Sequence, residues 1–223
     1  MKNNGYSVTP LFSKVFYCNN LTDITDESLA DIKQFISQQP YFNVATFENT
    51  MDYRGSHNVA ESTIKHDLLE TSTLEPLKQR ILDEFRIFKN KVLRTEDLEF
   101  GITTSWATRS IPGKEAPFHY HSNCYYSGIL YINVAPNSGD ICFKDFDSKS
   151  YSFDEKVKEW TIFNARTHSW TPENRDIIFF PAEVYHQFLV NKSNIDRYSI
   201  AFNLVPLGRV GTEDSEFIYR GIS

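Results

Sequence analysis

The chain has 223 residues, of which 40% are hydrophobic and 15% aromatic, so it is long enough for one domain with a sizeable core and too apolar to remain disordered. The formal net charge is -6 and the Lys and Arg residues form no run or stripe, which argues against nucleic-acid binding. Three widely spaced cysteines, Cys18, Cys124 and Cys142, do not indicate a disulfide scaffold. No apolar segment has the length of a secretory signal or a membrane span. We therefore expect a cytoplasmic protein without nucleic-acid or membrane partners; the oligomeric state stays open, and a homodimer is compatible with the sequence.

The first hundred residues predict mainly helices. Residues 7–17 alternate apolar and polar side chains and contain a proline, which is typical of an edge strand. Thr25 has the character of a helix cap, and the helix that it starts is expected to stop before Pro40. A second amphipathic helix is expected to begin near Thr73. The polar segment 48–66 between the two helices is expected to be a loop.

From residue 98 onward the pattern changes to short apolar segments separated by Pro, Gly, Asn and Asp. Strands are expected at 100–106, 126–134, 140–146, 160–164, 176–181, 187–191 and 197–205. Helices followed by a series of short strands are typical of an antiparallel double-sheet barrel with helices packed on one face. We therefore expect a mainly β fold with flanking helices, formed as one domain over residues 1–223. Its helical buttress would cover about 20–95 and its barrel core about 98–206.

Histidine residues give the first indication of chemistry. His119 and His121 are two residues apart, so on a strand their side chains point to the same face, and His121 and Asn123 have the same relation. His186 follows a strongly apolar segment, where a buried ligand is often found. Neutral imidazoles suit iron, zinc or copper. A single histidine is better interpreted as a surface or core residue, but the pair, the later histidine and a downstream arginine together favour a metal site.

That arginine, Arg197, alternates with Ser199 in a segment with the pattern of a strand, so the two side chains share a face. A guanidinium that points into a barrel is costly to bury unless it meets an anion, and its planar fork matches a carboxylate. The alternative is a surface arginine paired with an acidic neighbour such as Asp196.

Three motifs carry a resemblance to a known family. They are Leu130-Tyr131-Ile132-Asn133 after the histidine pair, Phe179-Phe180-Pro181 before His186, and Arg197-Tyr198-Ser199. With them, residues 100–206 resemble the double-stranded β-helix core of the Fe(II)/2-oxoglutarate-dependent oxygenases, a jelly-roll or cupin-like barrel. The resemblance is closest to the prolyl-4-hydroxylase-like branch and to the oxygenases common in marine bacteria and their phages. It implies a barrel buttressed by N-terminal α-helices, with Fe(II) as the metal and 2-oxoglutarate as the cosubstrate.

The resemblance also implies roles for individual residues. His119 matches the proximal histidine ligand of the metal, and His186 matches the distal one. Arg197 matches the residue that pairs with the distal carboxylate of 2-oxoglutarate, and Ser199 and Tyr131 match its hydrogen-bonding partners.

The third metal ligand departs from the family pattern. The family has His-x-Asp or His-x-Glu, whereas here His121 stands in the acidic position, and in the alternative frame Asn123 does so. We expect His119, His121 and His186 to bind the metal, with Asn123 and Asp140 as alternative ligands. A third imidazole leaves more of the metal charge uncompensated than a carboxylate does. The missing acid is also compatible with an open coordination position, as in halogenating relatives, or with a loss of catalysis.

Other residues near this core receive weaker interpretations. Trp106, Tyr125 and Tyr126 are expected to line the substrate side, and the long polar insert 148–175 is expected to act as a lid or clamp. The histidines outside the motifs, namely His57, His66 and His168, are expected to face solvent.

The leading functional hypothesis is an oxygenase that binds Fe(II) and 2-oxoglutarate and hydroxylates an unactivated C–H bond, releasing succinate and CO2. The prolyl-hydroxylase resemblance favours a peptidyl or amino-acid substrate. A cupin-type dioxygenase with three histidine ligands is the first alternative, and it gives no role to 2-oxoglutarate or Arg197. The second alternative is an inactive barrel that serves as a binding module.

Overall fold

The computed structural model describes residues 2–3, 6–7, 9–10, 13–43, 59–95, 98–146 and 156–219. In chain order, the elements are β1 (Lys2–Asn3), β2 (Tyr6–Ser7), β3 (Tyr17–Asn20), α1 (Asp26–Ser37), β4 (Tyr41–Asn43), β5 (Glu61–Thr63), η3 (Leu68–Glu70), α2 (Glu75–Phe88), η4 (Lys89–Leu93), β6 (Phe100–Ser110), β7 (Ala116–His119), β8 (Tyr126–Asn133), β9 (Ile141–Lys144), β10 (Thr167–Trp170), β11 (Asp176–Pro181), β12 (Tyr185–Phe188), β13 (Arg197–Pro206), β14 (Gly208–Val210), η5 (Glu213–Ser215) and β15 (Phe217–Tyr219).

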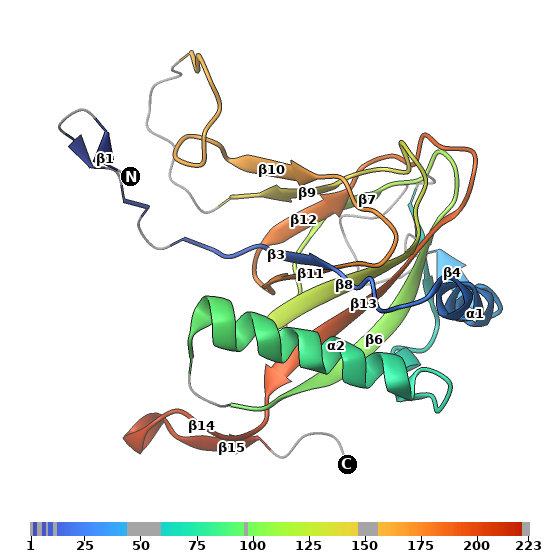
Figure 1. Ribbon diagram of the computed structural model, residues 1–223, viewed down its shortest axis with the longest axis horizontal. Helices are drawn as coiled ribbons and strands as arrows, with labels where there is room; N and C mark the ends of the chain where they lie inside the picture. Colours follow the sequence, from blue (N-terminus) through green and yellow to red (C-terminus); the bar gives the residue numbers. More distant parts are fainter. Residues whose placement is uncertain are drawn as a thin grey trace.

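Two antiparallel sheets form the barrel (Figure 1). The larger sheet has the strand order β3-β11-β8-β13-β6-β5-β4, and the smaller sheet has the order β10-β9-β12-β7. The predicted mainly β barrel with flanking helices is confirmed. The N-terminal part contributes more than a helical buttress, however, because β3 extends one edge of the larger sheet and β4 and β5 extend the other.

Helix α1 begins where the sequence predicts. Thr25 is its N-cap, and the Thr25 hydroxyl accepts a hydrogen bond of 3.1 Å from the backbone N–H of Ser28. Such a cap contributes about 1 kcal/mol. The helix buries Leu29 and Ile36 and ends at Ser37, before Pro40.

Helix α2 lies across the larger sheet on the side away from the smaller sheet (Figure 1). Its buried apolar side chains follow helical spacing and form one stripe: Leu77, Ile81, Phe85 and Phe88. The rings of Phe85 and Phe88 lie 5.1 and 5.9 Å from that of Phe179 in β11. Burial of a Phe side chain contributes about 1.5–3 kcal/mol, so this contact fixes the helix on the outer face of the barrel.

The alternation of side chains along β8 separates the outer core from the barrel interior. Leu130 and Ile132 belong to the outer core, which includes α1 and α2. Ile129 and Tyr131 belong to the inner cluster between the two sheets. Ser127, Ile129 and Tyr131 of β8 therefore face the interior of the barrel.

A buried carboxylate joins β3 to α2. Glu84 is 1% exposed and accepts hydrogen bonds from Tyr17 Oη (2.5 Å), Asn19 Nδ2 (2.7 Å) and Arg80 Nη1 (2.9 Å). Burial by itself raises the pKa of Glu84. The three hydrogen bonds together outweigh this effect, so the pKa lies below its usual value. The carboxylate is therefore charged at neutral pH and holds the edge strand against the helix.

Three segments differ from the sequence-based expectation. In the segment predicted as an edge strand, β3 begins only at Tyr17, which is the first residue to pair with β11, opposite Phe179. The predicted strand at 160–164 is a turn in which the Thr161 N–H donates to Asn164 Oδ1 at 2.7 Å, a local bond that competes with strand pairing. The expected loop contains β5, and its residues 48–58 lie outside the described part of the chain.

Candidate metal centre

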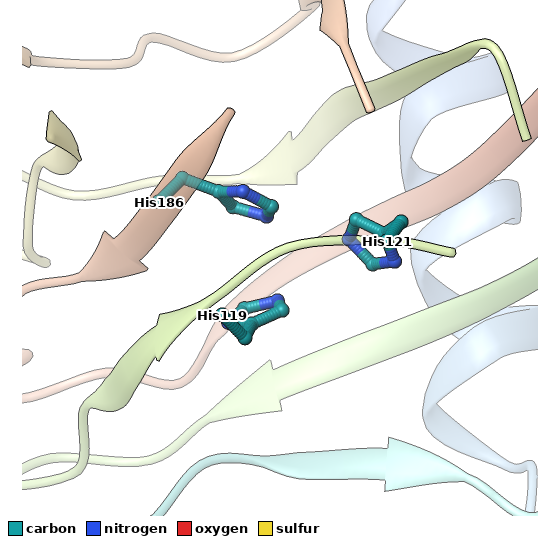
Figure 2. A group of neighbouring side chains, drawn as sticks. All are labelled: His119, His121 and His186. Atoms are coloured by element: carbon teal, nitrogen blue, oxygen red, sulfur yellow. The ribbon is translucent and has the colours of Figure 1, made fainter. Parts of the chain in front are cut away.

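Strand pairing brings three histidines together. His119 in β7 and His186 in β12 are direct partners across the two strands, and the backbone N–H of His121 donates to the Ala182 carbonyl at 3.0 Å. The possible ligand atoms of the three imidazoles all lie within 4.8 Å of one another. Figure 2 shows the rings of His119 and His121, from one segment, converging with that of His186 from the neighbouring strand.

Backbone carbonyls orient two of the three rings. Nδ1 of His119 lies 2.9 Å from the Pro117 carbonyl oxygen, and Nδ1 of His186 lies 3.0 Å from that of Val184. A carbonyl oxygen only accepts hydrogen bonds, so Nδ1 must carry the proton in both rings. The lone pair of each Nε2 is then available to a metal, which is the arrangement usual for histidine ligands.

The environment keeps these imidazoles neutral. Burial, together with the neighbouring His119, lowers the pKa of His121 to about 3. Burial also lowers the pKa of His119, and burial together with the other two histidines lowers that of His186 well below its usual value. At pH 7 the site therefore offers three uncharged nitrogen donors, a set that suits Fe(II) or Zn(II).

No carboxylate joins this group within the described residues. Asp140 is engaged elsewhere, since one of its oxygens accepts a hydrogen bond from Thr171 at 2.8 Å. Asn123 is exposed and adopts a left-handed backbone conformation with φ 61°. A divalent cation bound by the three histidines would keep its full double charge until an anionic ligand arrived.

Arg197 is held inside the barrel as a cation. Its side chain is 1% exposed, and Nη1 donates to the carbonyl oxygens of Ser138 (3.1 Å) and Gly139 (2.8 Å). Its guanidinium carbon lies 4.6 Å from the centre of the Phe188 ring. Burial lowers the pKa of Arg197, but a guanidinium remains charged at neutral pH.

Three buried donors around this guanidinium have no hydrogen-bond partner among the described residues. They are Arg197 Nη2, Tyr131 Oη and Ser199 Oγ. Tyr131 and Ser199 are direct partners across β8 and β13, and Arg197 shares the face of Ser199. An unsatisfied buried polar group costs about 1–3 kcal/mol, and native proteins contain few of them. One cation and two hydroxyl groups form a donor set that fits a carboxylate, as 2-oxoglutarate would provide.

A cavity of about 380 Å³ lies between the two sheets, and all three histidines line it. Inward side chains of β6, β8 and β13 form the opposite wall. Phe188 lines the cavity, and its ring also contacts Arg197, which does not line it. The imidazoles therefore face an open space, whereas the guanidinium lies outside the cavity lining.

The residues expected to line the substrate side differ in their positions. Trp106 does line the cavity, with its ring 5.5 Å from that of His121. Tyr125 is 62% exposed and does not line it. The expectation for Tyr126 is wrong, because this residue packs in the outer core against α2. His66 is exposed, as expected, but it also contributes to the cavity wall, with its ring 5.8 Å from that of Trp106.

The two remaining histidines stand apart from the site. His168 is exposed on β10, as expected, with its ring 5.7 Å from that of Phe16. His57 lies outside the described residues.

Sequence reasoning missed several polar residues of the cavity wall, among them Thr104, Ser127 and Asn203. One signal was available for Asn203, because it is six residues after Arg197 on one strand and so shares the inward face. Ser127 has the same parity as Tyr131 on β8.

The fold is a double-stranded β-helix barrel, and its interior holds three converging histidines and a buried arginine. Residues 104–203, which carry all of these groups, match the family described as "Putative 2OG-Fe(II) oxygenase". The resemblance found in the sequence is thereby confirmed, and its marine bacterial and phage qualifier stays a prediction.

Solved structures share this fold at low sequence identity. A prolyl-4-hydroxylase from Pseudomonas putida is 15% identical with a TM-score of 0.53, and the match covers 86% of this chain and 94% of that one. A prolyl hydroxylase from Trichoplax adhaerens, in complex with a peptide fragment of the hypoxia inducible factor oxygen degradation domain, is 13% identical with a TM-score of 0.55, over 85% and 83% of the two chains. HygX from Streptomyces hygroscopicus, with nickel, 2-oxoglutarate and hygromycin B bound, is 12% identical with a TM-score of 0.54, over 86% and 82%.

Comparison with curated proteins gave no match. Within the described part of the chain, every helix is too short or too polar to cross a membrane.

Proposed function

We propose that this protein is an Fe(II)- and 2-oxoglutarate-dependent oxygenase that hydroxylates an unactivated C–H bond, with a peptidyl or amino-acid side chain as the substrate. One observation carries the proposal. A buried guanidinium and two hydroxyl groups beside it lack hydrogen-bond partners among the residues that the structure describes, and they lie in the same barrel as three converging neutral imidazoles. In a metal-binding barrel without a diacid cosubstrate, the buried cation would lack an anion to offset the cost of its burial.

The residues divide the work between metal and cosubstrate. His119, His121 and His186 would hold Fe(II), and Arg197 would bind the far carboxylate of 2-oxoglutarate with help from Tyr131. When bound, Fe(II) and 2-oxoglutarate together supply the oxidising power with which O2 converts C–H to C–OH, leaving succinate and CO2. The protein side chains fix the geometry and keep water away from the reacting bond.

The charges of the site are consistent with a dianionic cosubstrate. Three neutral ligands leave both charges of the metal uncompensated, and Arg197 adds one more. A dicarboxylate brings two negative charges to these positions, and it therefore takes over part of the compensation that an acidic ligand gives in the usual family pattern. We expect metal and cosubstrate to bind with strong positive coupling for this reason.

The test is anaerobic addition of Fe(II) and 2-oxoglutarate to the metal-free protein. We expect a weak visible charge-transfer band. In Arg197→Ala the metal should still bind, but the band should disappear and affinity for 2-oxoglutarate should fall at least about tenfold, since charged hydrogen bonds are lost. Arg209→Ala is the matched control, because Arg209 is exposed and pairs with Glu216 on the C-terminal hairpin. A wild-type protein that binds Fe(II) but shows no band, or an Arg197→Ala variant that keeps it, would contradict the proposal.

The same experiment separates the alternatives. The all-histidine ligand set favours a cupin-type dioxygenase as the second candidate, which would bind metal and ignore 2-oxoglutarate. An inactive barrel that serves as a binding module would bind neither.

The setting of this activity also remains a proposal. The whole chain would act as a single oxygenase domain in the cytoplasm, and peptides or small molecules would be its partners. The three cysteines of the sequence, Cys18, Cys124 and Cys142, are free thiols, which is usual in a reducing compartment.

A further inference from the structure

A row of hydrogen-bonded polar side chains crosses the cavity wall opposite the histidines. Thr104 in β6, Asn203 in β13 and Ser127 in β8 are direct partners across three adjacent strands. Ser127 Oγ lies 2.9 Å from Asn203 Oδ1, and Asn203 Nδ2 lies 2.9 Å from Thr104 Oγ1. All three residues line the cavity, although Ser127 is only 2% and Asn203 only 9% exposed.

This row sits where the sheet is irregular. The pairing of β13 with β6 shifts register between Asn203 and Leu204. Bulges of this kind redirect side chains and are over-represented next to active sites. Polar groups on a buried sheet face are unfavourable unless they are paired. These three side chains pair with one another, and their remaining hydrogen-bonding capacity is available on the cavity side.

The row keeps one donor and one acceptor for a ligand. Asn203 uses its amide oxygen on Ser127 and one amide hydrogen on Thr104, which leaves the Thr104 hydroxyl hydrogen unused. The Cys124 thiol, 3.9 Å from Ser127 Oγ, can donate to one lone pair of that oxygen, and the second lone pair remains for a ligand. If the amide is turned by 180°, the donor and the acceptor exchange ends, and one of each still remains. A neutral amide group, with one C=O acceptor and one N–H donor, matches this row.

The wall that carries the row has no free charge among the described residues. Glu61 is its one carboxylate, and Arg109 binds that carboxylate through both Nε and Nη2. A free amino acid would bring an ammonium and a carboxylate into this space without partners of opposite charge, which is costly. A residue inside a peptide chain presents only neutral amides.

Aromatic rings lead from the metal centre to the outer end of the cavity. The Trp106 ring lies 5.5 Å from His121 and 5.8 Å from the exposed His66, whose ring lies 6.4 Å from Phe42. Phe42 and His66 line the same cavity. Flat aromatic walls favour an apolar side chain that enters from the outside.

We propose that the substrate is an uncharged residue within a peptide chain, whose main-chain amide is bound by Thr104, Asn203 and Ser127 while its side chain extends along Trp106 towards the histidines. This inference rests on the proposed function, because it places the target C–H bond at that metal centre. Thr104, Asn203 and Ser127 would then determine the specificity for peptide substrates.

The test compares peptides with free amino acids. Acetylated and amidated Ala-X-Ala tripeptides, with X each of the uncharged residues, and the corresponding free amino acids are titrated into the Zn(II)- and 2-oxoglutarate-loaded protein and followed by ligand-observed NMR. We expect at least one tripeptide to bind at least about tenfold more tightly than its free amino acid. In Thr104→Val and in Asn203→Ala that affinity should fall about tenfold, as a lost buried hydrogen bond implies.

Two controls keep the result specific. Thr104→Ser retains the hydroxyl and should keep wild-type affinity. Thr22→Val changes an exposed threonine in the turn before α1, which does not line the cavity, and should also leave the affinity unchanged.

Three results would overturn the inference: no tripeptide binds, free amino acids bind as tightly as the peptides, or the Thr104 and Asn203 variants bind like the wild type. These failures are distinguishable from a failure of the proposed function, which would show as loss of 2-oxoglutarate binding to the wild-type protein while the peptides still bind.

Discussion

The two ends of strand β13 make different environments inside one barrel. At its start, Arg197 carries a full charge and is 1% exposed, and neither its Nη2 nor the two neighbouring hydroxyl groups have a hydrogen-bond partner in the described part of the chain. Near its other end, Asn203 is neutral, has its hydrogen bonds to Ser127 and Thr104 and borders an open cavity. The histidines line the cavity across from Asn203.

This difference implies that the cosubstrate requirement at Arg197 is fixed, whereas the substrate preference at the row can be adjusted. A buried, unpaired cation is tolerable only with a particular anion in place, so the Arg197 end can serve one class of cosubstrate. A satisfied neutral row is stable by itself and discriminates by hydrogen-bond geometry alone. We therefore expect cosubstrate binding to be strict and substrate binding to be moderate and tunable.

Removal of a metal ligand should give the largest effect. It should weaken cosubstrate binding near the start of β13 and leave peptide binding near its other end unchanged. In His186→Ala, affinity for Mn(II) should fall more than about 100-fold, beyond the loss usual for residues that only orient a ligand. Binding of 2-oxoglutarate should fall with it, because the metal no longer contributes. Binding of the best tripeptide should change little, since the row stays intact. Isothermal titration of each ligand measures this, with His168→Ala, an exposed histidine, as the control; equal losses for peptide and diacid would refute the separation.

Placing an acidic ligand at position 121, as in the usual family pattern, should give a smaller effect. The change should be confined to the affinities for the metal and 2-oxoglutarate. In His121→Asp, a carboxylate would compensate one charge of the metal. We expect Mn(II) to bind about tenfold more tightly without 2-oxoglutarate, and the gain in metal affinity on adding 2-oxoglutarate to shrink. Metal titrations with and without the diacid measure both quantities. An unchanged coupling would mean that charge compensation does not govern cosubstrate binding here.

A change outside the barrel should affect stability and neither end of β13. In Glu84→Gln, we expect the free energy of unfolding at pH 7 to fall by about 2 kcal/mol, because the charged hydrogen bonds to Tyr17, Asn19 and Arg80 weaken. The folded-state pKa of Glu84 is lowered, so its contribution is present above the unfolded value of about 4.3 and is lost as the pH falls through the lower folded value.

Urea unfolding of both proteins from pH 7 to pH 3 checks this expectation, with Glu27→Gln at an exposed position of α1 as the control. The difference between wild type and Glu84→Gln should narrow at the acidic end. A difference that widens on acidification would assign the opposite sign to the pKa shift.

Much of the candidate site was predictable from the periodicity of the sequence. The spacing of His119 and His121, and of Arg197 and Ser199, follows the two-residue repeat of a strand, and the structure places each pair inside the barrel. The same rule would have corrected one error. Tyr126 and Tyr131 are five residues apart on β8, so they face opposite sides of the sheet, and only one of them was able to face the interior.

The remaining features depend on register, which one sequence does not specify. Thr104 and Asn203 are 99 residues apart, and their hydrogen bond exists because β6 and β13 pair at that position. The position of His66 on the cavity wall depends likewise on β5, which joins the larger sheet from the segment 48–66 that was expected to be a loop. Long-range pairing of this kind follows from the packing of the whole domain.

Because β13 runs from Arg197, the proposed cosubstrate anchor, to the proposed amide-binding row, the two-residue repeat of the strand fixes the spacing between the two groups. If both proposals hold, substitutions at the row should change which substrate binds and leave cosubstrate binding at Arg197 unchanged. A one-residue insertion within the strand would instead turn one of the two groups out of the barrel. Substitutions on this strand should therefore be tolerated better than insertions or deletions that alter its length.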